Sequence, residues 1–258
     1  MPSITFEIQA HVAVITLNRP EKFNSFNREM ALELQAALDA CALDEYIRCV
    51  YITGTGKAFC AGQDLGELTG ANPIGFEKIL SEHYNPIVSK IKNLQKPVVA
   101  AVNGVAAGAG ANIALCCDVV VAAHSASFIQ AFSKIGLIPD SGGTYTLPRL
   151  IGWQKASALM MLGDKIAATE AERLGMIYKV LEDEHFAEAS MKIAITLSQM
   201  PTRGLALTKQ ALGQSWGNSF DQQLATEDRL QYEAAQTDDY QEGVASFLEK
   251  RMPIFTGK

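Results

Sequence analysis

A run of glycine and alanine between a buried strand and a helix constrains this chain more than any other segment. The run spans Ala101 to Asn112 (AVNGVAAGAGAN), overlaps the β-branched stretch Val98 to Val102, and leads into the apolar segment Ile113 to Cys117. Such small residues leave the N–H groups of the first helical turn accessible, and the helix dipole favours negative charge there. The run therefore predicts a site for a phosphate or for a developing enolate oxygen. Close backbone packing is the alternative.

The glycine spacing excludes the common phosphate-binding motifs. Gly108 and Gly110 begin a G-x-G-x-x-G pattern, but Ile113 stands where the third glycine would be. The pattern G-x-x-x-x-G-K-[ST] of phosphate-binding loops does not occur in the chain. Other segments have to decide between the remaining interpretations.

Length and charge limit the class of protein. The chain has 258 residues, of which 48% are hydrophobic, and we expect one compact unit with a large core. The formal net charge is −6 and the basic residues are scattered, which argues against nucleic acid as a partner. The N-terminus lacks the pattern of a signal or transit peptide, and no apolar run reaches the ~18 residues of a membrane span. We therefore expect a cytoplasmic protein with no membrane partner.

Cysteine and histidine form no metal-binding pattern. The five cysteines lack C-x-x-C spacing, and the four histidines stand apart in the sequence. Reduced, buried thiols are the usual state of such cysteines inside cells. The sequence predicts no metal site.

Strand and helix patterns alternate and then give way to helices. Strands are expected at 4–8, 12–17, 49–53, 98–102, 119–123 and 126–128. Helices are expected at 28–43, 76–94, 154–162, 169–174, 186–199, 201–215, 220–235 and 239–249. This order predicts an α/β fold with a helical C-terminal part.

Three further segments, together with the glycine-rich run, resemble one protein family. They are Gly56 to Leu65 (GKAFCAGQDL), Gly136 to Thr144 (GLIPDSGGT) and Gly163 to Gly175 (GDKIAATEAERLG). The chain is similar to the crotonase family, the enoyl-CoA hydratase/isomerase superfamily, from about residue 4 to 258. The resemblance implies a crotonase-like spiral of ββα units over 1–200 and a C-terminal helical trimerisation region over 201–258, in one structural unit. A homotrimer or a dimer of trimers is the implied assembly.

The resemblance also assigns candidate roles by position. Crotonases bind acyl thioesters of coenzyme A, which is part of the substrate, so no separate cofactor is expected. Two backbone N–H groups hold the thioester enolate, and the corresponding donors here are Gln63 and Ala109. The residues implied to bind the acyl-CoA are Lys22, Ala61, Gly62, Gln63, Asp64, Leu65, Gly108, Ala109, Asn112, Phe132, Phe255 and Lys258, of which the last two often act from a neighbouring subunit.

Two departures from the hydratase pattern narrow the reaction. Hydratases of the family use two glutamates, and Asn112 and Phe132 fill those positions here. Neither an amide nor a phenyl ring transfers protons at neutral pH, so two-carboxylate hydration is not expected. Asp140 remains as a candidate acid/base, because relatives that shift double bonds place an aspartate at this position. A turn or a helix cap is the alternative role for it.

The implied activity is that of an intramolecular isomerase for an unsaturated or aromatic acyl-CoA, with Asp140 as the only proton carrier. A Δ3,Δ2-enoyl-CoA isomerase of fatty-acid breakdown is one alternative, and a non-catalytic crotonase-like scaffold is another. His83 and Tyr84 can line the acyl pocket, although packing on a helix face is the commoner explanation for such residues.

Overall fold

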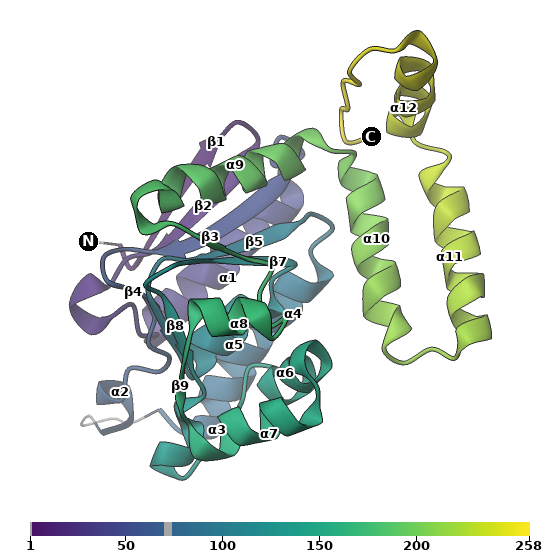
Figure 1. Cartoon of the computed structure of the whole chain (residues 1–258). Helices are drawn as coiled ribbons and strands as arrows, with labels where there is room; N and C mark the ends of the chain where they lie inside the picture. The colour runs from purple at the N-terminus through teal and green to yellow at the C-terminus, as the bar shows by residue number, and fades with distance from the viewer. Residues whose placement is uncertain (1, 70–73) are drawn as a thin grey trace.

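A computed structural model describes residues 2–69 and 74–258, whose strands form two sheets (Figure 1). The larger sheet has the order β1 (Ile4–Gln9), β2 (Val12–Leu17), β3 (Cys49–Gly54), β5 (Val98–Val102), β7 (Val119–Ala123), β10 (Lys179–Leu181). The smaller sheet has the order β4 (Ala58–Cys60), β6 (Val105–Ala107), β8 (Ser127–Ile129), β9 (Lys165–Ala167). Neighbouring strands are parallel except in the pairs β1–β2 and β8–β9.

The chain contributes one strand to each sheet per turn and then a helical segment, so the expected spiral of ββα units is confirmed. β3 and β4, β5 and β6, and β7 and β8 are the successive pairs. The helical segments that follow them are α2 (Gly66–Thr69), α3 (Phe76–Lys78), η2 (Ile79–Tyr84) and α4 (Asn85–Asn93), then α5 (Ala109–Cys116), then η3 (Ala131–Ile135) and α6 (Gly143–Ile151). These repeats bring the loops after β4, β6 and β8 to one region of the molecule.

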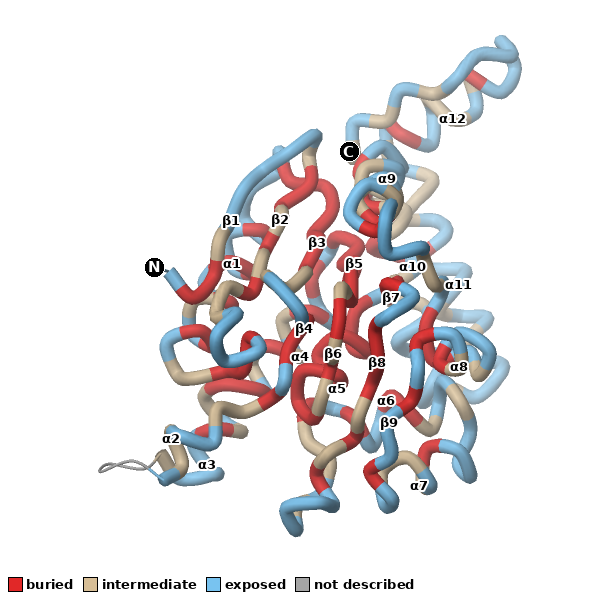
Figure 2. The backbone as a smooth tube through the Cα atoms, turned by 60° about the vertical axis from the view of Figure 1, so that its left-hand side comes forward, coloured by how far each residue is buried: buried red, intermediate tan, exposed pale blue. Residues whose placement is uncertain are grey.

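Helices pack on the larger sheet, and its central strand β5 is buried along its whole length. All five residues of β5 are buried, which suits a parallel strand with both faces covered (Figure 2). α1 (Arg28–Leu43) begins where Asn27 accepts a 3.0 Å hydrogen bond from the Met30 N–H. Its buried residues pack into the same core as the strands. The remaining elements before the C-terminal part are η1 (Pro20–Lys22), α7 (Trp153–Leu162), α8 (Ala168–Arg173), η4 (Asp183–His185) and α9 (Phe186–Gln199).

Three helices extend from one side of this spiral: α10 (Thr202–Ser215), α11 (Phe220–Ala234) and α12 (Asp238–Glu249) (Figure 1). The Lys209 ammonium of α10 lies 2.7 Å from the Asp118 carboxylate, which ties this part to the spiral. Large apolar side chains stay exposed on it, namely Leu212, Phe220, Tyr232, Phe247, Leu248, Met252 and Ile254. The division at residue 200 and the trimeric assembly stay predictions.

The long elements follow the sequence patterns closely, and the short ones do not. The bounds of α1, β5, β7 and α9 agree with the expected ranges. The strands β4, β6, β9 and β10 were not predicted, because three residues are too few to display a period. α6 includes Pro148, where the sequence predicted helix only afterwards. Within the described residues, no helix combines the length and the apolar character that crossing a membrane requires.

Candidate active site

The loop after β4 and the turn between β6 and α5 lie against each other. A Cβ atom added to Gly62 would lie 3.0 Å from the Ala107 carbonyl oxygen and 3.4 Å from the Ala109 nitrogen. Gly62 has a φ of +90° and Gly108 a φ of +54°, values that glycine adopts readily. These glycines therefore allow a close approach that side chains would prevent. The two backbones that carry the predicted donors are brought together here.

The N–H groups of Gln63 and Ala109 are both available. Ala109 is the first residue of α5, so its N–H has no partner within the helix. The flanking Gly62 and Asp64 exchange backbone hydrogen bonds with Phe26, at 2.7 and 2.8 Å, but the Gln63 N–H has no acceptor among the described residues. Two adjacent free donors form an arrangement that suits a developing oxyanion.

Asp140 lies in the loop between η3 and α6, and contacts from α5 hold this loop. The Asn112 amide donates a 2.9 Å hydrogen bond to the Asp140 carbonyl, and the Cys116 thiol donates one of 3.5 Å to the Ser141 carbonyl. Ser141 and Gly142 follow with φ values of +51° and +73°, so the backbone turns sharply before α6. One helix thus carries the Ala109 donor at its start and positions Asp140 from its next turn.

The carboxyl of Asp140 is half-buried and only partly hydrogen-bonded. Oδ1 accepts a 2.8 Å hydrogen bond from the Ser141 hydroxyl, whereas Oδ2 has no partner in the described part of the chain. Burial raises the pKa of the Asp140 carboxyl above its ordinary value, although the hydrogen bond from Ser141 opposes this. A carboxyl with one free oxygen and a raised pKa can both take up and return a proton.

Asn112 and Phe132 occupy different surroundings. Asn112 is fully buried; its Oδ1 accepts a 2.8 Å hydrogen bond from Gln130, and its Nδ2 is bonded to the Asp140 carbonyl. The ring of Phe132 is buried, and its Cζ atom would lie 3.8 Å from a Cβ added to Gly108. Asn112 therefore supports the Asp140 loop, and Phe132 makes the side of the site beside Gly108 apolar.

Four further predicted contacts lie along the loop after β4 or beside it. Lys22, Ala61 and Leu65 are exposed, and their contact with an acyl-CoA stays a prediction. Asp64 instead forms a 2.9 Å ion pair with Arg19. Burial acts to raise the pKa of Asp64, but the hydrogen bonds from Arg19 and the Gly66 N–H outweigh it and hold the pKa below the ordinary value. This carboxylate is committed to the loop structure.

The C-terminal residues of the same chain lie elsewhere. Arg48 donates a 2.7 Å hydrogen bond to the Phe255 carbonyl, and Lys258 pairs with Glu45 at 3.1 Å. The C-terminus is high in both views of the molecule, whereas α5 and α6 lie in its lower half (Figures 1 and 2). Contact of Phe255 and Lys258 with a substrate therefore requires a neighbouring subunit and stays a prediction.

Two residues outside the predicted set belong to this region. The Tyr84 hydroxyl donates a 2.7 Å hydrogen bond to Gln63 Oε1, and Gln130 supports Asn112 from a position that is 2% exposed. Interpreting Tyr84 only as a residue that packs on a helix face does not predict its hydrogen bond to Gln63. The sequence Tyr84-Asn85-Pro86 held a usable signal, because a proline disturbs the hydrogen bonds of the preceding helical turn.

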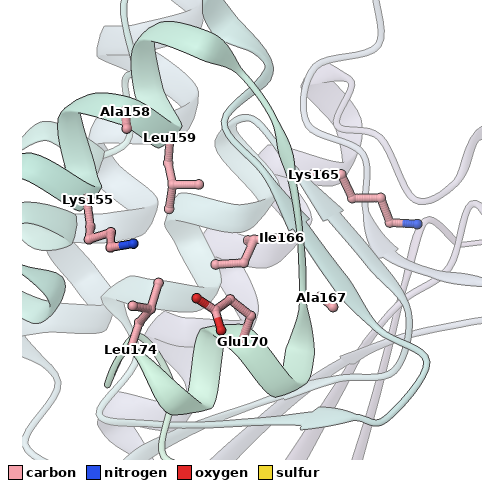
Figure 3. Close-up of a pocket in the computed structure, with 8 residues that line it drawn as sticks. All are labelled: Lys155, Ala158, Leu159, Lys165, Ile166, Ala167, Glu170 and Leu174. Atoms are coloured by element: carbon pink, nitrogen blue, oxygen red, sulfur yellow. The ribbon is translucent and has the colours of Figure 1, made fainter.

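A groove between α7, β9 and α8 contains none of these residues (Figure 3). Its lining residues are Lys155, Ala158, Leu159, Lys165, Ile166, Ala167, Glu170 and Leu174. Glu170 is its only carboxylate, and both carboxylate oxygens are bonded to Arg173 on the same helix, at 2.6 Å. Among its lining residues the groove therefore offers no free carboxylate.

Comparison with known proteins agrees with the fold and the loop geometry. The family model described as enoyl-CoA hydratase/isomerase matches residues 7–258. The chain is 47% identical to 1,2-epoxyphenylacetyl-CoA isomerase of Escherichia coli K12, with all of both chains covered. It is 46% identical to a probable enoyl-CoA hydratase of Rhodobacter capsulatus, covering 99% of this chain and 98% of the relative. The crystal structure of a Mycobacterium abscessus enoyl-CoA hydratase/isomerase superposes with a TM-score of 0.93 at 35% identity, covering 99% of this chain and 100% of that one.

The chain therefore belongs to the crotonase family of acyl-CoA hydratases and isomerases. Its relatives bear both hydratase and isomerase names, so the family alone does not specify the reaction.

The support that Asn112 gives to Asp140 can be tested with Asn112→Asp. A carboxylate cannot donate a hydrogen bond to the Asp140 carbonyl, and two oxygens would then face each other in a buried place. We expect the variant to lose about 1–3 kcal/mol of unfolding free energy and to turn over acyl-CoA substrates more slowly. Urea unfolding and steady-state rates would measure both. The matched control is Asn93→Asp, at the exposed end of α4, and unchanged stability of Asn112→Asp would contradict the supporting role.

Proposed function

We propose that the protein is an acyl-CoA isomerase that converts 2-(1,2-epoxy-1,2-dihydrophenyl)acetyl-CoA into oxepin-CoA in phenylacetate breakdown. The observation that carries the proposal is the Asp140 carboxyl, which has a raised pKa and one oxygen without a partner among the described residues. It lies in a loop held by the helix whose first N–H belongs to Ala109. The 47% identity to the E. coli protein named for this isomerisation supports the choice of substrate.

In the proposed reaction, Asp140 takes a proton from the carbon next to the thioester. The N–H groups of Gln63 and Ala109 donate hydrogen bonds to the enolate oxygen that forms. The carbon–carbon bond that the epoxide shares with the ring breaks while both carbon–oxygen bonds are kept, so the ring expands to include the oxygen atom. The enolate electrons form a double bond between the side chain and the ring, the ring double bonds shift, and Asp140 returns the proton to a ring carbon. Substrate and product are isomers, so the step needs no co-reactant.

The surroundings of Asp140 favour isomerisation over hydration. Hydration by two carboxylates needs a second free acid near the site. The Asp64 carboxylate is paired with Arg19, and both oxygens of Glu67 accept hydrogen bonds, from the Arg28 N–H and from Gln63 Nε2. A Δ3,Δ2-enoyl-CoA isomerase needs the same single acid/base, so it remains the second candidate. A scaffold without activity would have no use for two adjacent backbone donors together with a carboxyl of raised pKa in a loop held by the same helix.

Three substrates distinguish these candidates. The purified protein is incubated with enzymatically generated epoxyphenylacetyl-CoA, with 3-hexenoyl-CoA and with crotonyl-CoA, and products are followed by mass-resolved chromatography. Oxepin-CoA as the main product is the expected result. Turnover of 3-hexenoyl-CoA alone would assign the protein to fatty-acid breakdown, and hydration of crotonyl-CoA alone would make it a hydratase. No turnover of any substrate would support the scaffold.

A further inference from the structure

We propose that Tyr84 is a positioning residue that orients the Gln63 peptide toward the substrate oxygen through a hydrogen bond to the Gln63 side chain. The inference rests on the proposed enolate chemistry and adds to it a residue that does not itself contact the reacting atoms.

A π-helical turn carries Tyr84 to this place. The helix that runs from α3 to α4 changes over Ile79–Tyr84, where the Asn85 N–H bonds to the Leu80 carbonyl, five residues back. Pro86 lacks an N–H and cannot serve the Glu82 carbonyl, which the Gln35 amide reaches instead at 2.8 Å. Such turns occur mostly as local departures from α-helix and often at functional sites. The extra residue rotates the helix face on which Tyr84 lies.

The hydrogen bonds around Gln63 determine the direction of the contact. Gln63 Nε2 lies 3.1 Å from a carboxylate oxygen of Glu67, which can only accept, so Nε2 must donate there. Gln63 Oε1 is therefore the atom that faces Tyr84, and the tyrosine hydroxyl donates to it across 2.7 Å. The Gln63 side chain is held at both ends of its amide.

The surroundings of Tyr84 keep this donor in place. The side chain is 1% exposed, and its ring packs edge-on against Phe26 at a centroid distance of 5.9 Å. Burial, together with the nearby Cys60 and Asp140, raises the pKa of the Tyr84 hydroxyl well above its ordinary value. The hydroxyl accordingly stays protonated and can donate throughout the physiological pH range.

Phe26 and Tyr84 together hold the donor peptide from two sides. The Phe26 backbone accepts a hydrogen bond from the Asp64 N–H and donates one to the Gly62 carbonyl. Gln63 lies between these two bonds, and its side chain is anchored by Tyr84. The Gln63 N–H thereby keeps one direction although it has no acceptor in the described part of the chain. Loss of the tyrosine hydroxyl would leave the backbone bonds and release only the side chain.

The test uses Tyr84→Phe, which removes the hydroxyl and retains the ring that packs on Phe26. The probe is phenylacetyl-CoA, whose protons next to the thioester exchange with D2O when an enolate forms. We expect the variant to exchange them about 3- to 10-fold more slowly at saturation, with KM nearly unchanged. Because the probe carries no epoxide, a wild type that exchanges these protons but makes no oxepin-CoA would refute the proposed reaction and leave the Tyr84 inference standing.

A second readout does not depend on activity. Hydrogen exchange of the backbone in the peptide covering residues 59–66 is expected to speed up in Tyr84→Phe. Tyr51→Phe is the matched control, because the Tyr51 hydroxyl is also buried and bonded, to Ser190 at 2.8 Å, but outside the site. The same acceleration in the control, or none in Tyr84→Phe, would overturn the inference.

A double-mutant comparison shows whether Tyr84 acts through Gln63. Gln63→Ala retains the backbone N–H and removes the acceptor of the tyrosine hydroxyl. We expect Tyr84→Phe to have no further effect on proton exchange in the Gln63→Ala background. Equal fold-losses in both backgrounds would mean that Tyr84 acts independently of Gln63, and the inference would be wrong.

Discussion

Asp140→Asn is expected to lower kcat/KM for acyl-CoA isomerisation by about 10²- to 10⁴-fold, the usual contribution of a general acid/base. The amide keeps an oxygen that can accept the hydrogen bond from Ser141, so the loop conformation should persist. It cannot take a proton from the substrate. Steady-state assays at several pH values measure the loss, and wild-type rates in this variant would exclude Asp140 as the proton carrier.

The same variant is expected to be more stable than the wild type at neutral pH. The folded protein raises the pKa of Asp140 by burial, so the folded state binds this proton more tightly than the unfolded state. Stability therefore falls as the pH rises through the raised pKa, because the ionised carboxylate is disfavoured in the fold. Asp140→Asn removes this loss of stability because its amide does not ionise. Its advantage in Tm should shrink as the pH is lowered toward ~4, where an ordinary aspartate is itself protonated. A Tm difference that does not depend on pH would contradict this account.

Gly62→Ala is expected to lower kcat/KM by about 10²- to 10³-fold, comparable to removal of an oxyanion donor. The new methyl would lie 3.0 Å from the Ala107 carbonyl and 3.4 Å from the Ala109 nitrogen, so it would separate the two loops and obstruct the space beside the donor. The φ of +90° adds backbone strain of roughly 1–2 kcal/mol. Rates and Tm should be measured together.

Gly175→Ala distinguishes the effect of backbone strain from the effect of obstructing the space beside the donor. Gly175 also has a positive φ, +75°, but an added Cβ would meet nothing closer than 3.9 Å, and it lies outside the candidate site. We expect this control to lose a similar amount of stability and to keep its activity. If Gly62→Ala were folded and retained kcat/KM within about threefold, the two loops would not hold the oxyanion.

Long periodic segments carried enough information to predict most of the fold. α1 begins at its predicted first residue, Arg28, where Asn27 accepts a hydrogen bond from the Met30 N–H, and β5 is buried because an unbroken apolar run suits a covered parallel strand. The short strands β4 and β6 form because neighbouring turns of the spiral pair with them. No local pattern contains that information, so these strands appear only in the assembled structure.

For the candidate site, too, some features could be predicted from the sequence and others depend on the tertiary structure. The sequence by itself determined the glycines that permit close backbone approach, the absence of the hydratase glutamates at Asn112 and Phe132, and the presence of Asp140 before a turn. Only the tertiary structure decided that Asn112 supports Asp140 and that Tyr84 reaches Gln63. Residue type and local spacing set what a side chain can do. Hydrogen bonds between residues 21 and 28 positions apart arise from packing, and packing decides which of those possibilities is used.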